Sequence, residues 1–206
     1  MTRRAALTRF SFIAAPVLLI AYGCIRLFAV GSRAPGWAWT TGHAAFLLGV
    51  VLFGVACTGL HRIAAADGGP ARRRFARGGL VAGLVGTGAA FTQAAVDLYV
   101  GLRAADKPEM RELFAQVQDI PGVMPLVYTV GPLFLYVGLI TLLASLTGRD
   151  ALRSLLLVVV GTVAIGSDLD FLPVGGLCYL LAFAPLTRRV TAVLDPGPAS
   201  TRPQAA

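Results

Sequence analysis

The stretch from Gly79 to Leu102 is the part of this sequence that most restricts the possible folds. It is predominantly apolar over 24 residues. At about 1.5 Å rise per residue, a helix of this length crosses a hydrocarbon core of roughly 30 Å. Its second half carries Gln93 and Asp97, which lie four residues apart and therefore on one helical face. Because a carboxylate is costly to place in lipid, that face is expected to meet other helices or a water-filled cavity.

Five further apolar stretches can supply these partner helices. The chain has 206 residues, of which 56% are hydrophobic and 14% are charged, and its mean hydropathy is +0.74. These values are typical of a polytopic membrane protein and not of a soluble domain. We therefore predict an all-α bundle in a membrane domain over residues 1–190, followed by a disordered cytoplasmic tail over 191–206. The six predicted transmembrane helices are 10–30, 43–63, 79–102, 125–148, 152–167 and 171–187.

The basic residues predict the orientation of the six spans. The net charge of +8 does not indicate nucleic-acid binding, because these residues stand in short clusters between apolar spans. With the N-terminus inside, the inner segments hold thirteen of them and the outer segments four. The inner ones are Arg3, Arg4, Arg9, Arg62, Arg72, Arg73, Arg74, Arg77, Arg149, Arg153, Arg188, Arg189 and Arg202, and the outer ones are Arg33, Arg103, Lys107 and Arg111. The positive-inside rule thus predicts a multi-pass protein of the cell membrane with both termini cytoplasmic.

Residues 106–119, between the third and fourth spans, have a different pattern. Apolar side chains recur there at the spacing of one helical stripe, with charged and amide side chains on the other face. Asp106 can cap the start of this helix, and Pro108 suits its first turn. We predict a short amphipathic helix on the outer membrane face, which either covers a site or simply connects two spans. The stripe consists of Met110, Leu113, Phe114 and Val117.

Polar side chains from several spans should meet at the outer end of the bundle. Asp97 lies near the outer end of the third span, Arg26 lies at a comparable depth in the first, and His43 begins the second. Asp168 and Asp170 form the tight outer turn between the last two spans. Arg26 and Asp97 are candidates for an ion pair between helices. The two turn aspartates also suit turn formation and helix capping.

Aromatic residues in the fourth span suggest a pocket near these groups. Tyr128, Pro132 and Tyr136 follow one another at four-residue spacing, and Pro132 should kink the helix because it lacks an N–H. Such rings either line a pocket or pack as ordinary core. The candidate catalytic residues are Asp97, Asp168 and Asp170. The candidate substrate-binding residues are Arg26, His43, Gln93, Tyr99, Tyr128, Tyr136 and Phe171.

Several motifs with known chemistry do not occur. The sequence has no phosphate-binding loop, no HExxH, no CxxC and no DDxxD pair of the kind that holds magnesium diphosphate. The cysteines, Cys24, Cys57 and Cys178, are far apart inside apolar segments. We therefore predict neither a metal site nor a cofactor.

The layout resembles that of small six-span bacterial membrane proteins. The features that carry this resemblance are the Trp-rich first loop before Gly42-His43, the segment from Asp97 to Arg103, Gln118 to Gly122, and Asp168 to Gly175. More loosely, the bundle with buried acids and aromatic rings looks like membrane-embedded terpene cyclases, enzymes of secondary metabolism.

This second resemblance implies an acid-initiated reaction. Burial in a low-dielectric pocket favours the protonated form of an Asp, which can then act as a general acid on a prenyl chain. Aromatic faces stabilise the developing carbocation. We therefore expect a metal-independent terpene cyclase that takes a lipophilic isoprenoid-type substrate from the bilayer. The alternatives are a small ion-coupled transporter, in which the buried charges relay protons, and a non-catalytic membrane subunit.

Overall fold

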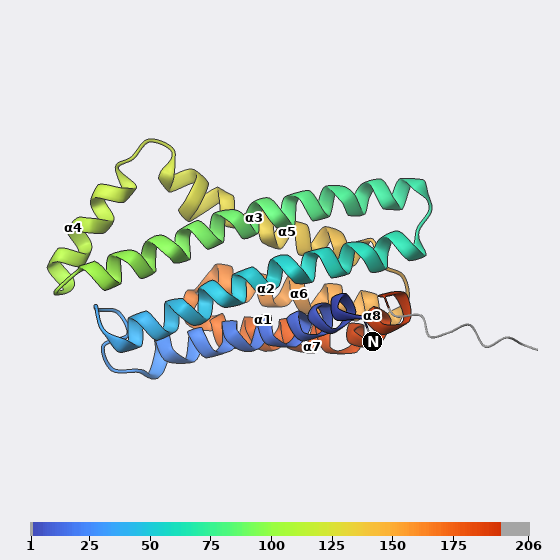
Figure 1. Ribbon diagram of the computed structural model, residues 1–206, viewed down its shortest axis with the longest axis horizontal. Coiled ribbons are helices and arrows are strands. Elements are labelled where there is room, and N and C mark those ends of the chain that lie inside the picture. Colours follow the sequence, from blue (N-terminus) through green and yellow to red (C-terminus); the bar gives the residue numbers. More distant parts are fainter. Residues whose placement is uncertain (1, 195–206) are drawn as a thin grey trace, which may run out of the picture.

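The computed structural model describes residues 2–194, and these residues form helices and turns without a strand (Figure 1). Six helical segments are apolar enough and long enough to cross a bilayer, as the sequence predicts. They are α1 (Arg3–Phe28), α2 (Trp37–Asp67), α3 (Pro70–Arg103), η1 (Met124–Thr129) with α5 (Val130–Ala144), α6 (Arg149–Ser167), and the segment Leu169–Leu194, which contains η2 (Leu169–Phe171), α7 (Leu172–Phe183), η3 (Ala184–Leu186) and α8 (Thr187–Leu194).

The helices extend beyond the apolar spans at several ends. Helix α2 begins six residues before His43, and α3 begins nine residues before Gly79. Backbone hydrogen bonds continue a helix through polar residues, so hydropathy alone underestimates its length. Residues 191–194, which were predicted to belong to the tail, are instead the last residues of α8. The predicted tail residues 195–206 lie outside the described part of the chain.

The six spans form a closed ring in which each helix contacts the next. The order around the ring is α1, α2, α3, α5, α6 and α7, and α7 returns to contact α1. Helix α4 (Lys107–Gln118) lies at one end, which we call the α4 end, together with the α1–α2 connection and the α6–α7 turn (Figure 1). The opposite end carries the α2–α3 and α5–α6 connections and α8. We call it the basic end, because the arginine clusters lie there.

Glycines allow α3 and α5 to approach closely. A Cβ atom at Gly86 would overlap the backbone nitrogen of Leu135, and one at Gly138 would overlap the backbone of Gly83. Small residues at such positions let two helix backbones pack together without a hydrophobic driving force. This contact places the second half of α3, with its polar residues, beside the start of the η1–α5 segment.

The η1–α5 segment begins with a wide turn of π-helix. The N–H of Val130 donates to the carbonyl of Pro125, five residues earlier, and the hydroxyl of Thr129 donates to the carbonyl of Met124 over 3.1 Å. A kink was predicted at Pro132, and the irregular turn lies just before it. Pro132 cannot donate to the carbonyl of Tyr128, which favours a departure from regular α-helix there. Such π-turns are frequent at functional sites, and this one contains Tyr128.

Helix α4 packs against α2 and α3 at the α4 end of the bundle. The carboxylate of Asp106 accepts a hydrogen bond from the backbone N–H of Glu109 over 2.9 Å, so it caps the helix as predicted. Met110 is buried in a small cluster with Val100 of α3. The ring of Phe114 lies edge-on to Trp39 of α2, with 6.1 Å between ring centroids. Helix α4 therefore packs beside the polar residues of α2 and α3 that are described next.

Candidate functional site

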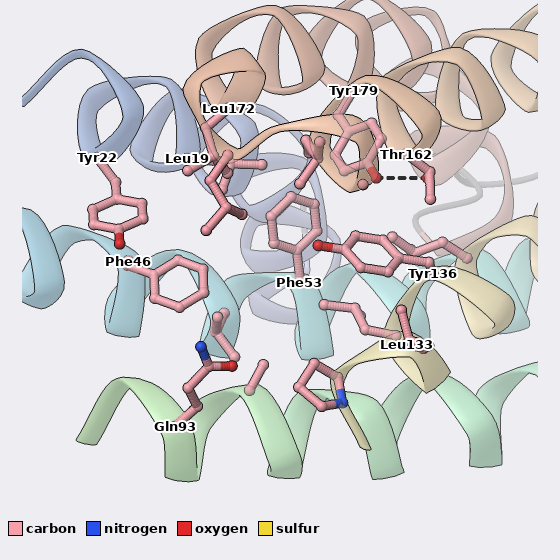
Figure 2. Close-up of a pocket in the computed structure, with 18 of the residues that line it drawn as sticks. Leu19, Tyr22, Phe46, Phe53, Gln93, Leu133, Tyr136, Thr162, Leu172 and Tyr179 are labelled. Carbon is pink, nitrogen blue, oxygen red and sulfur yellow. Dashed lines mark hydrogen bonds between the residues drawn. The ribbon is translucent and has the colours of Figure 1, made fainter. Parts of the chain in front are cut away.

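The ring of helices encloses a cavity of about 480 Å³ in the half of the bundle toward the α4 end. All six spans contribute to its wall, which is mostly aliphatic and aromatic (Figure 2). The lining residues are Leu19, Tyr22, Phe46, Val50, Phe53, Ala90, Gln93, Tyr128, Thr129, Pro132, Leu133, Leu135, Tyr136, Leu139, Thr162, Ile165, Gly166, Ser167, Asp168, Leu169, Leu172 and Tyr179.

Aromatic rings form much of this wall. Phe46 and Phe53 reach in from α2 and Tyr136 from α5, and Figure 2 shows the three side chains directed into the same space. At the side nearer the basic end, Tyr179 lies edge-on to Phe53, and its hydroxyl shares a 2.8 Å hydrogen bond with Thr162. The cavity therefore offers π-faces to a ligand, with few polar groups among them.

A buried pair of titratable side chains lies behind the cavity wall, between α2 and α3. The Nε2 atom of His43 is 3.8 Å from Oδ2 of Asp97, and the two residues are 5% and 8% exposed. The Nδ1 atom of His43 is 2.9 Å from the backbone carbonyl of Trp39. A carbonyl only accepts, so Nδ1 carries a proton and Nε2 faces the carboxylate. A proton can therefore be held at either Nε2 or Asp97.

Two tyrosine hydroxyls connect this pair to the cavity. The hydroxyl of Tyr128 donates to Oδ1 of Asp97 over 3.1 Å, and the hydroxyl of Tyr22 is 3.5 Å from Nε2 of His43. Both tyrosines also line the cavity. His43 and Asp97 themselves do not line it. A proton that moves between the pair and a ligand would therefore pass through a phenol.

Trp39 holds both members of the pair in place. Its indole stacks on the imidazole of His43, with 3.9 Å between ring centroids and 24° between the planes. Its Nε1–H donates to the backbone carbonyl of Asp97 over 2.8 Å. A Cβ atom at Gly101 would overlap this indole, so the glycine makes room for it. One side chain thus links α2 to α3 at the level of the pair.

The cavity opens at the side, between α5 and the end of α6. Leu133 on α5 and Leu169 in η2 line it and are about half exposed. Gly166 also lines it and is exposed, and a Cβ atom there would meet no atom within 4 Å. In a membrane the Leu133 side of this opening would face the acyl chains, whereas Ser167 and Asp168, which also line the cavity and are exposed, lie at the α6–α7 turn.

Asp170 and Arg26 form a separate ion cluster near the α6–α7 turn. The Nε atom of Arg26 is 3.4 Å from Oδ1 of Asp170, and Nη2 of Arg33 is 3.1 Å from the same oxygen. The suggested pair of Arg26 with Asp97 is therefore wrong, because Asp97 contacts His43 and Tyr128 instead. Asp168 uses its Oδ1 to accept the backbone N–H of Asp170 over 2.8 Å, which is a capping role.

The structure divides the predicted site residues into four groups. Gln93, Tyr128, Tyr136 and Asp168 line the cavity. His43 and Asp97 form the pair behind it, and Arg26 and Asp170 form the ion cluster. Tyr99 and Phe171 are about half exposed and are not among the lining residues. Tyr128 therefore contacts Asp97, while Gln93 lines the cavity and Asp97 does not. Of the charged residues expected at the outer level, Asp97 contacts His43, and Asp170 contacts Arg26.

Two residues that contact the His43–Asp97 pair were not predicted from the sequence. Trp39 stands four residues before His43, and Tyr22 stands four residues before Arg26, so each shares a helical face with a residue that was singled out. That spacing is the signal that would have found them. In the sequence Trp39 counted only as part of the Trp-rich first loop.

Among the described residues, no three His, Cys, Asp or Glu side chains come together to hold a metal ion. No protein-family model, no curated protein and no solved structure matches this chain.

Proposed function

We propose that this protein is a membrane-embedded enzyme that transfers a proton to a lipophilic, isoprenoid-type substrate and thereby starts its cyclisation. One observation carries the proposal: Tyr128 lines the apolar cavity while its hydroxyl contacts the buried carboxyl group of Asp97. A buried acid, a proton path and an aromatic pocket thus occur at one place.

The proton transfer can be written with the residues present. When Asp97 is protonated on Oδ1, its O–H donates to the Tyr128 oxygen, and the Tyr128 O–H is free to point into the cavity. The substrate alkene takes the Tyr128 proton and forms a new C–H bond, while Tyr128 takes the proton of Asp97. The cyclised cation then loses a different proton to Tyr128, which returns one to Asp97. The product is an isomer of the substrate, and the enzyme returns to its starting state.

His43 and the aromatic wall support this step in different ways. The Nε2 atom of His43 lies beside Oδ2 of Asp97, so a proton taken up at Nε2 would stabilise the carboxylate that forms when Asp97 gives up its own proton. The faces of Phe46, Phe53 and Tyr136 stabilise positive charge on the substrate without attacking it. Exclusion of water from the cavity would protect the cation from hydration.

The shape of the cavity supports a lipophilic substrate. A volume of about 480 Å³ is within the roughly 300–1,000 Å³ typical of small-molecule pockets. The side opening at Leu133 and Gly166 would admit an isoprenoid directly from the bilayer. Gln93 and Asp168 are among the polar side chains of the wall, and they would orient a hydroxyl or carbonyl group of the substrate.

We propose different roles for Asp97 and Asp170. Asp97 is the proposed proton donor. Asp170 pairs with Arg26 and Arg33 and is not among the residues that line the cavity, so it has no direct contact with a substrate there.

The packing of the basic end favours an enzyme over a transporter. Transport requires the cavity to open alternately toward both faces of the membrane. In this half of the bundle the space between the helices is filled by large side chains without solvent exposure, including Leu60, Ile63, Leu142 and Leu186. We further propose the orientation given by the basic residues, with both termini cytoplasmic and α4 as an amphipathic helix on the outer membrane face.

Solvent deuterium gives a direct test of this reaction. Membranes that contain the protein are incubated in D₂O with a panel of prenyl alcohols and prenylated aromatic compounds, and products are analysed by retention time and mass. The expected product is an isomer of its substrate that carries one deuterium on carbon, because Asp97 and Tyr128 exchange their protons with D₂O between turnovers and then deliver deuterium to the substrate. A transferase or an oxidase would not give this pattern.

Substitutions identify the donor. Asp97→Asn keeps the size of the side chain but cannot deliver a proton, and we expect turnover to fall by about 10²-fold or more. Asp119→Asn removes an exposed carboxylate outside the site and serves as the matched control, with unchanged turnover expected. The proposal is refuted if the wild-type protein converts no member of the panel, or if Asp97→Asn retains full activity. Proton flux in liposomes without product formation would identify a transporter.

A further inference from the structure

A groove lies on the lipid-facing surface of α6, toward the basic end. Its volume is about 400 Å³, and its lining residues all belong to one stripe of this helix. Leu152 and Leu156 in this stripe are more than half exposed, as is Val160. The lining residues are Arg149, Leu152, Arg153, Leu156, Leu157 and Val160. The groove therefore has two guanidinium groups at one end and an aliphatic surface along the rest.

A third guanidinium group stands beside this charged end. A Cβ atom at Gly148 would lie only 3.0 Å from Nη2 of Arg189, so Arg189 approaches the residue next to Arg149. The nearest acidic residue in sequence is Asp150, which is exposed and is not among the lining residues. The charged end thus favours an anion, and a phosphate can be bound by two or more arginines.

The length of the stripe fits one acyl chain. Arg149 and Val160 are eleven residues apart, which is about 16 Å along a helix. Half of a hydrocarbon core is about 15 Å thick. A lipid whose phosphate lies at Arg149 and Arg153 would therefore extend its chain along Leu152 and Leu156 as far as Val160.

We propose that this groove is a binding site for an anionic phospholipid, with Arg149 and Arg153 on the phosphate and one acyl chain along α6. Charge complementarity at one end and an apolar surface of matching length at the other select this ligand. A zwitterionic lipid offers the same chain with a less favourable head group. A soluble phosphate ester offers only the head group. The site is separate from the cavity, which lies in the other half of the bundle.

The test uses the purified full chain in detergent and measures thermal unfolding by tryptophan fluorescence. Phosphatidylglycerol is titrated against phosphatidylcholine with the same acyl chains, and glycerol phosphate is tested as the head group alone. A ligand that binds the folded state raises the unfolding temperature with its concentration. We expect phosphatidylglycerol to stabilise the protein at lower concentration than phosphatidylcholine, and glycerol phosphate to have no effect at equal concentration.

Substitutions locate the effect in the groove. A basic residue near an anionic head group contributes about a five-fold change in affinity, so R149Q/R153Q should raise the half-effective concentration of phosphatidylglycerol by about 30-fold. R73Q/R74Q removes the same charge from exposed positions of α3 and should change the half-effective concentration of phosphatidylglycerol little. R149K/R153K keeps the charge and should retain the preference. If R149Q/R153Q does not fold, the single R153Q variant is compared with R153K instead.

Three results would overturn the proposal. The first is equal stabilisation of the wild-type protein by the two lipids. The second is an equal loss of the phosphatidylglycerol effect in R73Q/R74Q and R149Q/R153Q. The third is full displacement of phosphatidylglycerol by glycerol phosphate. A concentration-dependent dimer that is lost in R149Q/R153Q, with no lipid preference, would instead assign the groove to a second copy of the chain.

Discussion

Replacement of Gly86 by alanine is the sharpest test of how α3 and α5 pack. The added Cβ atom would overlap the backbone nitrogen of Leu135 and would lie 2.5 Å from the carbonyl carbon of Phe134. Both atoms belong to the backbone, so no rotamer change can relieve the overlap. Helices α3 and α5 must then move apart. Asp97 of α3 and Tyr128 of η1, the turn that continues into α5, would separate with them, although they form a hydrogen bond in the structure.

Gly88 provides the matched control on the same helix. It is exposed, and a Cβ atom there would meet nothing within 4 Å. Alanine is favoured over glycine inside a helix by roughly 0.5–1 kcal/mol, so Gly88→Ala should stabilise the protein slightly. Gly86→Ala gains the same term, but overpacking of a tight interface costs about 1–3 kcal/mol. We expect the two variants to differ by about 1–3 kcal/mol, with Gly86→Ala the less stable.

The assay is equilibrium unfolding in mixed detergent micelles, followed by tryptophan fluorescence, for the wild-type protein and both variants. Trp39 reports on the region of interest because its indole bridges His43 and the backbone of Asp97. Equal unfolding free energies for Gly86→Ala and Gly88→Ala would refute the close approach of the two helices. The proposed path through Tyr128 would then lose its structural basis.

Three further predictions concern the cavity and its surroundings. Gly166→Phe should narrow the side opening and lower kcat/KM for a bulky isoprenoid by about ten-fold or more without loss of stability. Gly88→Phe is the control and should leave both kcat/KM and stability unchanged. Equal kcat/KM values for the two variants would place the entrance elsewhere. Tyr128→Phe leaves the buried carboxyl group of Asp97 without this donor and should lower the unfolding free energy by about 1–3 kcal/mol, measured as above; an unchanged value would argue against the hydrogen bond. Asp170→Asn removes a partly exposed ion pair and should change stability by less than about 1 kcal/mol, so a larger loss would show that the ion cluster holds the α6–α7 turn.

The sequence by itself determined the class and the layout of this protein. Apolar stretches long enough to cross a bilayer have few alternatives to helix, because lipid cannot satisfy backbone hydrogen bonds. The same reasoning predicted that Asp97 avoids lipid, and it is buried between helices. Local rules were equally sufficient for the cap at Asp106, whose partner lies three residues away.

The composition of the site was decided by the tertiary structure. Sequence position placed Arg26, His43, Asp97 and Asp170 at one level of the membrane, but depth does not specify which helices are neighbours. The order of the ring brings α2 beside α3, so Asp97 meets His43. It brings α1 beside α7, so Arg26 meets Asp170.

The cavity itself was also beyond the sequence. Tyr128 and Tyr136 could be predicted either to line a pocket or to fill a core, since aromatic side chains serve both purposes. Close approach at Gly83, Gly86 and Gly138 holds α5 against α3, and the π-turn before Pro132 directs Tyr128 toward Asp97. Whether six helices leave a space between them depends on side chains far apart in the chain. No local pattern contains that information, because packing is a property of the whole assembly.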